Sequence, residues 1–243
     1  MSAPPDVWAI VTARGGSAGL PGKNLCQLSG RPLLHHIVLA AKRSRLVTRA
    51  VLTTDSDEIE AAARQIDGLE VRRHDPAMSV VGQPSFHVFR NTVEAMLGGG
   101  GTAPRVVALL RATAPLCLAS DIDTAIGRLL ENEDGATAVV SVVRSDAHPQ
   151  RLYVMDGKGF LRAREDTPET DYPLPRQGFA PVYLRNGAIY ATFPEVVLGG
   201  SLWGARPLAY VMPKARSVNI NDETDMICAE ALIGRSRDDG LAH

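Results

Sequence analysis

Residues 7–24 read Val7-Trp8-Ala9-Ile10-Val11-Thr12-Ala13-Arg14-Gly15-Gly16-Ser17-Ala18-Gly19-Leu20-Pro21-Gly22-Lys23-Asn24. The apolar run 7–12 predicts a buried strand. A glycine-rich loop follows it directly, with Arg14 and Lys23 near its two ends. Glycines let backbone N–H groups approach phosphate oxygens closely, and the two cations can neutralise a polyphosphate. Its position at the carboxyl end of a first strand favours a ligand site in an α/β sheet.

The loop differs from two well-known nucleotide-binding loops. Ser17 stands where a Walker A sequence has its first glycine, and Asn24 follows Lys23 in place of Ser or Thr. No G-x-G-x-x-G spacing occurs, and the next helical pattern starts well downstream. Judged by glycine content alone, a surface turn with solvated charges is an equally good interpretation.

Beyond this loop, short apolar runs alternate with segments of helical period, which is typical of βαβ units and a mainly parallel sheet. Pro32 suits a first helical turn, and Ser56 and Ser120 suit helix caps. Helices are predicted over 32–43, 56–65, 85–97, 120–130 and 222–233, and strands over 7–12, 50–54, 69–72, 106–110, 136–143, 187–192 and 207–212.

The composition of the 243 residues is ordinary for a soluble globular protein. Lys and Arg number 26 against 27 Asp and Glu, so the net charge of −1 gives no reason to expect nucleic acid as a partner. No apolar run is long enough for a membrane span, and residues 1–6 lack a basic signal-peptide region. Three widely spaced cysteines favour neither a disulfide framework nor a zinc site. These features predict a cytoplasmic protein with no membrane partner.

The chain is predicted to form a single domain over residues 1–235. Within it, residues 144–183 lose regular patterning and contain five prolines among charged residues, which is typical of an extended insertion. Residues 236–243 are expected to form a flexible tail.

Several segments, in order along nearly the whole chain, resemble the acylneuraminate (CMP-sialic acid) cytidylyltransferases. Residues 13–24 resemble ARGGSKGLPGKN, 53–56 resemble STDS, 109–116 resemble LLQPTSPL, 185–190 match RNGAIY, and 218–225 occupy the place of VDIDTEED. The resemblance implies a three-layer α/β/α, Rossmann-like (GT-A-like) nucleotidyltransferase with a mainly parallel sheet, in which residues 144–183 form a dimerisation and substrate arm.

The same resemblance implies an enzyme that transfers CMP from CTP to the anomeric hydroxyl of a sialic-acid-like sugar. Pyrophosphate is released and Mg²⁺ assists. Catalytic roles fall to Arg14 and Lys23, at the triphosphate. Nucleotide contacts are implied for Ala13, Gly15, Gly16, Ser17, Asn24, Ser85 and Arg73, with Arg72 as the alternative to Arg73.

Substrate contacts are implied for Arg111, Thr113, Arg176, Gln177, Asn186 and Gly187. Arg176 lies on the arm, and the family places this arginine against the acidic sugar of the neighbouring subunit. A guanidinium fork suits a carboxylate well. A homodimer with shared active sites is therefore expected, although an arginine in a proline-rich loop is otherwise more often simply exposed.

The sequence departs from the family at positions near the substrate. Ala18 replaces a loop lysine, Arg111 a glutamine and Ala114 a serine, while Val80 and Val81 stand where an aspartate is usual. A partly buried arginine demands an acceptor. The acceptor can therefore be a sialic-acid-like sugar, a different keto-sugar acid or another small anionic molecule.

The family's pair of metal-binding aspartates reads Asn219 and Asn221 here. Neutral amides should hold Mg²⁺ more weakly than carboxylates do. Three interpretations stay open: the ion is held weakly by Asn219, Asn221 and Asp222, with Glu223 or Asp225 as substitutes; it arrives with CTP; or the chain is a non-catalytic nucleotide-binding paralogue. Acids at 222, 223 and 225 also suit the N-terminus of a helix.

Overall fold

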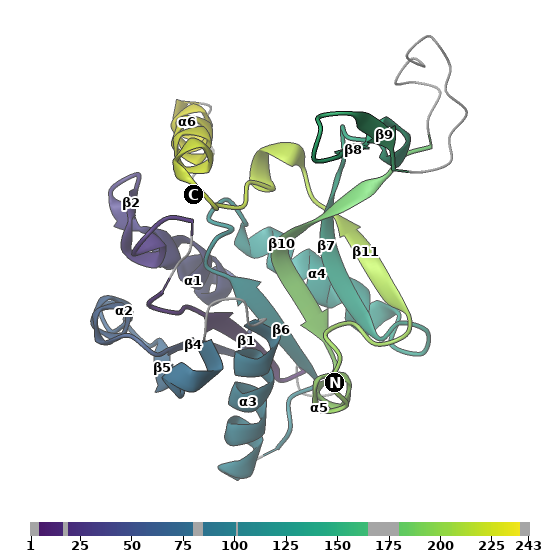
Figure 1. The fold of residues 1–243 in the computed structure, drawn as a ribbon. Coiled ribbons are helices and arrows are strands. Elements are labelled where there is room, and N and C mark those ends of the chain that lie inside the picture. Colours follow the sequence, from purple (N-terminus) through teal and green to yellow (C-terminus); the bar gives the residue numbers. More distant parts are fainter. Residues whose placement is uncertain (1–4, 17–18, 80–84, 101, 165–179, 239–243) are drawn as a thin grey trace.

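The computed structural model describes residues 5–16, 19–79, 85–100, 102–164 and 180–238. Its centre is a seven-stranded sheet in the order β11-β7-β10-β6-β1-β4-β5 (Figure 1). β10 is antiparallel to both of its neighbours, and the remaining pairs are parallel. The strands are β1 (Val7–Thr12), β4 (Arg49–Thr54), β5 (Glu70–Arg73), β6 (Val106–Arg111), β7 (Ala138–Arg144), β10 (Tyr183–Thr192) and β11 (Pro207–Val211).

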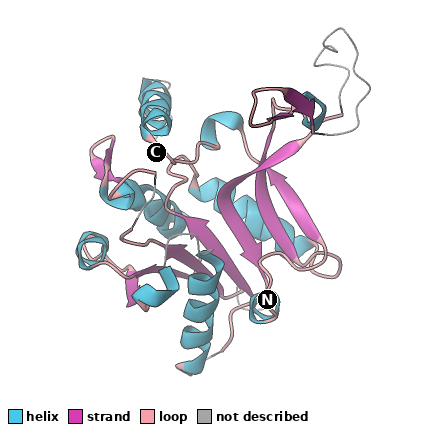
Figure 2. Cartoon of the chain, in the orientation of Figure 1, coloured by secondary structure: helices cyan, strands magenta, loops and turns pink. Residues whose placement is uncertain are grey.

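Helices cover both faces of this sheet, so the predicted three-layer α/β/α architecture is confirmed (Figure 2). Side chains of β1 alternate between two cores, with Val7, Ala9 and Val11 in one and Trp8 and Ile10 in the other. The first core packs against α1 (Leu33–Arg43), α2 (Asp57–Ala63) and α4 (Ala119–Glu131), and the second against α3 (Ser85–Gly98) and α5 (Pro194–Leu198).

The C-terminal helix α6 (Glu223–Asp238) lies over a third, smaller core. That core joins it to the short strands β2 (Gln27–Leu28) and β3 (Arg31–Pro32), to the start of α1 and to the segment after β6. Its buried members are Leu28, Leu33, Leu116, Ile220, Ala229 and Ile233. This packing brings the N-terminus of α6 next to the carboxyl ends of β1 and β6.

The described part of the insertion forms a hairpin of β8 (Tyr153–Met155) and β9 (Leu161–Ala163), apart from the main sheet. Short 3₁₀ turns occur at η1 (Lys23–Leu25), η2 (Pro76–Ser79), η3 (Pro149–Arg151) and η5 (Lys214–Arg216). Several residues discussed above lie outside the described residues, namely Ser17, Ala18, Val80, Val81, Arg176 and Gln177. The arm and single-domain assignments therefore stay predictions.

Some predicted boundaries were wrong. α4 begins at Ala119 instead of being capped by Ser120, because the Asp121 carboxylate accepts the Leu118 backbone N–H at 2.9 Å. β10 begins four residues early because it contains a bulge, α5 was not predicted, and α6 continues to Asp238 into the expected tail. Among the described helices, none is long and apolar enough to cross a membrane.

Candidate functional site

A cavity of about 220 Å³ lies at the carboxyl ends of β1 and β6. The chain proceeds from β1 outward through β4 to β5 and then returns to β6 on the other side of β1. Ligands of open α/β sheets bind at such a reversal of strand order. β1 contributes Thr12, and Ala13 and Arg14 after it also line the cavity. β6 contributes Arg111, and Ala112 and Thr113 after that strand line it as well.

The glycine-rich loop is held in place by contacts with distant segments. The backbone N–H of Gly15 donates to Asp55 Oδ1 at 2.7 Å, and Asn24 Nδ2 donates to the carbonyl of Arg14 at 2.9 Å. A Cβ on Gly19 would lie 2.4 Å from the carbonyl oxygen of Asn221, so only glycine permits this approach. The N–H of Gly15 is thus engaged by Asp55, whereas Gly16 lines the cavity.

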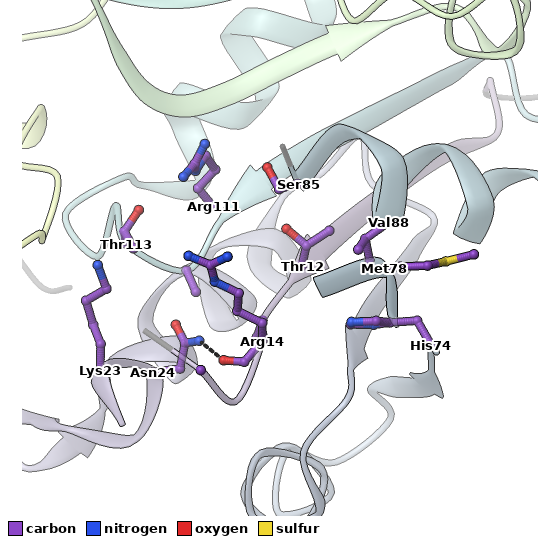
Figure 3. A pocket seen from close by; sticks show the side chains of 13 residues that line it. Thr12, Arg14, Lys23, Asn24, His74, Met78, Ser85, Val88, Arg111 and Thr113 are labelled. Atoms are coloured by element: carbon purple, nitrogen blue, oxygen red, sulfur yellow. Dashed lines mark hydrogen bonds between the residues drawn. The ribbon is translucent and has the colours of Figure 1, made fainter. Parts of the chain in front are cut away.

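Three cationic side chains, Arg14, Lys23 and Arg111, line the same cavity (Figure 3). Within the described part of the chain, no carboxylate forms an ion pair with any of them. Burial and the charges of Arg111 and Arg14 lower the pKa of Lys23, against the opposing effect of Asp225. Uncompensated positive charge makes this end of the cavity suitable for a polyanion.

The other end of the cavity is neutral. His74 is buried, and its Nδ1 lies 2.9 Å from Thr53 Oγ1. Burial lowers the pKa of His74, which favours the uncharged imidazole near pH 7. Figure 3 shows His74, Met78 and Val88 on one side of the cavity and Lys23, Arg111 and Thr113 on the other. The cavity therefore suits a ligand that has an uncharged body and an anionic end, with the anionic end at the cations.

The predicted base contact is not brought to the cavity. Arg73 instead forms an ion pair with Asp57 at 3.0 Å and donates to the Asp55 carbonyl, while Arg72 pairs with Glu70 at 2.5 Å. Ser85 does line the cavity, as do His74, Met78 and Val88, which the sequence reasoning did not select. His74 follows β5 directly, but only the turn after that strand places its ring inward.

Asn186 and Gly187 lie beside the cavity without lining it. Asn186 is buried, accepts from Ser141 Oγ at 2.6 Å and donates to Ser217 Oγ at 3.0 Å. These bonds support the bulge of β10. Gly187 has φ +74, and a Cβ there would lie 3.0 Å from Asn219 Nδ2, so this glycine allows the 219–221 segment to approach. Both residues therefore support the backbone next to the cavity and do not line it.

The acids near the candidate metal position serve the N-terminus of α6. Asp225 Oδ2 accepts the backbone N–H of Asn221 at 2.7 Å and that of Asp222 at 3.3 Å, and Asp222 Oδ1 accepts the N–H of Asp225 at 3.0 Å. This reciprocal pair is a capping box. Two of the three acids considered as ligands are thus occupied by helix capping.

The remaining groups fit a protein-held Mg²⁺ poorly. Asn221 donates from its side-chain amide to the Asn219 backbone carbonyl, and Asn219 Oδ1 is buried without a hydrogen bond to the described residues. Among the described residues, no group of three or more His, Cys, Asp or Glu side chains is placed to hold a metal ion. The amide oxygens of Asn219 and Asn221 are neutral, and neutral oxygens beside cationic side chains are a weak donor set for a hard divalent ion.

Comparison with known proteins identifies the family of this chain. The pattern that defines the family described as Cytidylyltransferase matches residues 8–190. The chain belongs to the cytidylyltransferase family. Among its relatives, the N-acylneuraminate cytidylyltransferase of Escherichia coli O18:K1:H7 is 28% identical over 218 residues, which are 89% of this chain and 49% of that protein. The present chain thus spans about half the length of the N-acylneuraminate cytidylyltransferases that it matches.

Two other similarities cover nearly the full length of both chains. Post-translational flagellin modification protein B of Campylobacter coli is 23% identical over 94% of this chain and 95% of its own. A solved CMP:2-keto-3-deoxy-manno-octonic acid synthetase in complex with CTP has a TM-score of 0.67 at 17% identity, covering 95% of this chain and 99% of that one. The latter likeness supports the cytidylyltransferase fold.

Proposed function

We propose that this protein is a CTP-dependent cytidylyltransferase that transfers CMP to the anomeric hydroxyl of a sialic-acid-like acidic sugar. The observation that carries the proposal is the cluster of Arg14, Lys23 and Arg111, which share one cavity with no carboxylate paired to them in the described residues. A triphosphate at these cations would direct its nucleoside toward the neutral end near His74. Membership of the cytidylyltransferase family supports cytosine as the base.

In the proposed reaction, the sugar oxygen attacks the α-phosphorus of CTP, the bond to the bridging oxygen breaks, and pyrophosphate leaves. The hydroxyl proton passes to solvent. Arg14 and Lys23 stabilise charge that develops on the phosphate oxygens, and removal of one such group typically costs about 10²–10³-fold in rate. The contacts of Gly15, Gly19 and Asn24 position the described parts of the loop before the reaction. Mg²⁺ associates with the phosphates of CTP and is not held by the protein, and the binding of CTP does not depend on it.

The acidic acceptor is supported by the named relatives. A sialic-acid-like sugar is the first candidate, because relatives from E. coli and other organisms are named N-acylneuraminate cytidylyltransferases. A different keto-sugar acid is the second candidate, because the octonic acid synthetase shares the fold over nearly its whole length. Ala114 is buried and lacks the hydroxyl of the family motif. The pocket chemistry is therefore expected to discriminate between such acids.

We also propose a homodimer, because the arm exposes apolar side chains. Tyr153, Met155, Phe160 and Leu161 are 55–70% exposed on the β8–β9 hairpin and its turn. Clustered exposed apolar side chains commonly mark protein interfaces. Arg176 and Gln177, the residues expected to reach the partner's sugar, belong to the same arm. Sedimentation equilibrium should give a dimer that Leu161→Glu weakens; a monomeric wild-type protein would refute this proposal.

A cytoplasmic location is also proposed. All three cysteines are free, and Cys228 is exposed. Free exposed thiols suit a reducing compartment. Cell fractionation of the full-length protein tests this, and recovery in an oxidising compartment would contradict it.

The activity is tested by incubating the purified full chain with CTP, Mg²⁺ and a panel of acids, and by measuring pyrophosphate release. We expect release with a nine-carbon acidic sugar and a loss of about 10²-fold or more in Lys23→Ala. Lys42→Ala, at an exposed position on α1, is the matched control and should keep full activity. Binding of CTP with no release for any acid would instead support the non-catalytic paralogue.

A further inference from the structure

We infer that Arg111 and Lys23 take the place of a protein-held divalent ion at the nucleotide phosphates, so that this chain binds CTP without Mg²⁺. The inference rests on the proposed function and concerns the same cavity. The observation behind it is that residues 219–221 lie next to Lys23 and Arg111.

Two backbone contacts place Lys23 at the candidate metal position. The N–H of Ile220 donates to the Thr113 carbonyl at 2.8 Å, which fixes the segment 219–221 against the end of β6. Lys23 Nζ donates to the Ile220 carbonyl at 2.8 Å. Since Ile220 lies between Asn219 and Asn221, the ammonium group is held at the two residues that would have to ligate the ion.

Arg111 reaches the same place from β6. A Cβ built on Gly187 would lie 3.0 Å from Asn219 Nδ2 and 3.9 Å from Arg111 Cδ. Asn219 and the aliphatic part of Arg111 therefore approach the same face of Gly187. Lys23 and Arg111 thus both lie close to the segment that carries the asparagine pair, Lys23 through the Ile220 carbonyl and Arg111 beside Asn219.

Charge decides what this arrangement can bind. A divalent ion would meet two like charges at close range, and the repulsion is strong where water is partly excluded. Nearby carboxylates offset this repulsion only in part, because Asp225 acts on the charge of Lys23 while Asp222 and Asp225 direct their oxygens to backbone N–H groups at the start of α6. Phosphate oxygens, by contrast, match a guanidinium fork and an ammonium group directly.

Two buried oxygens at this position, Thr113 Oγ1 and Asn219 Oδ1, have no hydrogen bond to any residue that the structure describes. Buried polar atoms normally have partners. The Thr113 hydroxyl can donate to a phosphate oxygen, and the Asn219 carbonyl can accept from a ligand hydroxyl. Both atoms are therefore suited to complete a site in which a bound nucleotide, with no metal ion, contacts the protein.

The test is isothermal titration calorimetry of CTP with the full-length protein, in EDTA and in Mg²⁺. We expect dissociation constants that agree within about 3-fold in the two conditions. Arg111→Gln should weaken binding in EDTA by about 10-fold or more, since a charge-assisted phosphate contact is lost. Arg128→Gln is the matched control, because Arg128 is exposed on α4, and it should leave both constants unchanged.

A second variant separates the metal from the arginine. In Arg111→Gln combined with Asn221→Asp, a carboxylate replaces an amide where a cation was removed, and CTP binding should become dependent on Mg²⁺. Wild-type binding that requires Mg²⁺ would overturn the inference while leaving the proposed reaction intact. So would an Arg111→Gln variant that binds CTP normally and only raises the KM for the acid. Metal-independent binding without pyrophosphate release for any acid would refute the proposed function alone.

Discussion

Arginines near the carboxyl ends of two neighbouring parts of the sheet have opposite surroundings. At β5, Arg73 pairs with Asp57 and Glu60, and Arg72 pairs with Glu70. After β1 and at the end of β6, Arg14 and Arg111 line the cavity with no ion pair to the described residues. The first group stabilises the protein's own structure, whereas the second is available to a ligand. The state of pairing, more than the presence of charge, therefore marks the anion site.

Another arginine, Arg216, is paired with a buried carboxylate. Arg216 donates to both oxygens of Asp121 at 2.8 and 2.9 Å, and Asp121 also accepts from the Tyr210 hydroxyl at 2.7 Å. Asp121 is fully buried, in the first turn of α4, while Arg216 belongs to η5 after β11. This contact ties the two segments together and offers nothing to a ligand.

The largest expected effect comes from breaking that buried pair. Arg216→Met leaves the Asp121 carboxylate buried without its cation, so the free energy of unfolding should fall by about 3 kcal/mol or more. Arg64→Met is the control, because Arg64 forms an exposed pair with Glu60 one helical turn away, and it should lose less than about 1 kcal/mol. Urea denaturation measures both. Equal losses in the two variants would show that the buried pair has no special role.

A smaller effect distinguishes the two arginine groups in ligand binding. Arg14→Gln should raise the dissociation constant of CTP by about 10- to 100-fold, since it removes an unpaired charge at the phosphates. Arg73→Gln should change it by less than about 2-fold, since Arg73 is already neutralised by acids. Calorimetry at one fixed salt and Mg²⁺ concentration makes the comparison. If Arg73→Gln weakens binding as much as Arg14→Gln does, the cavity is not where CTP binds.

The smallest expected effect concerns pH. Burial and the hydrogen bond to Asp121 raise the pKa of Tyr210 to about 12. The folded protein therefore keeps this proton at pH values where the unfolded chain, with an ordinary tyrosine pKa of about 10, has lost it. Stability from this group is complete below about pH 10 and declines as the pH rises toward 12.

Tyr210→Phe should flatten that decline, as seen in urea midpoints between pH 9.5 and pH 11.5. Tyr153→Phe, at an exposed position on β8, should keep the wild-type slope. If stability declines with pH in Tyr210→Phe as steeply as in the wild type, the pKa of Tyr210 is not the cause of the decline.

Local pattern was sufficient for much of the fold. The apolar run 7–12 coincides with β1, and the helical period over 32–43 coincides with α1 to within one residue. The family resemblance assigned Arg14, Arg111 and Thr113 to the site, and the structure places all three around one cavity. The bulge of β10 escaped prediction, since it depends on Ser141, which bonds to Asn186 and Ile189 from another strand.

The amino-acid order alone was thus enough for the fold class, the cytidylyltransferase family and the cations of the glycine-rich loop. Periodicity and motif spacing are local, and they survive without coordinates. Tertiary structure was needed to show that Arg73 is neutralised, that His74 turns inward, and that Lys23 meets the asparagine pair 197 residues away through Ile220. These outcomes depend on which distant groups come into contact, because pairing and burial, rather than residue type, determine whether a charge is free to bind a ligand.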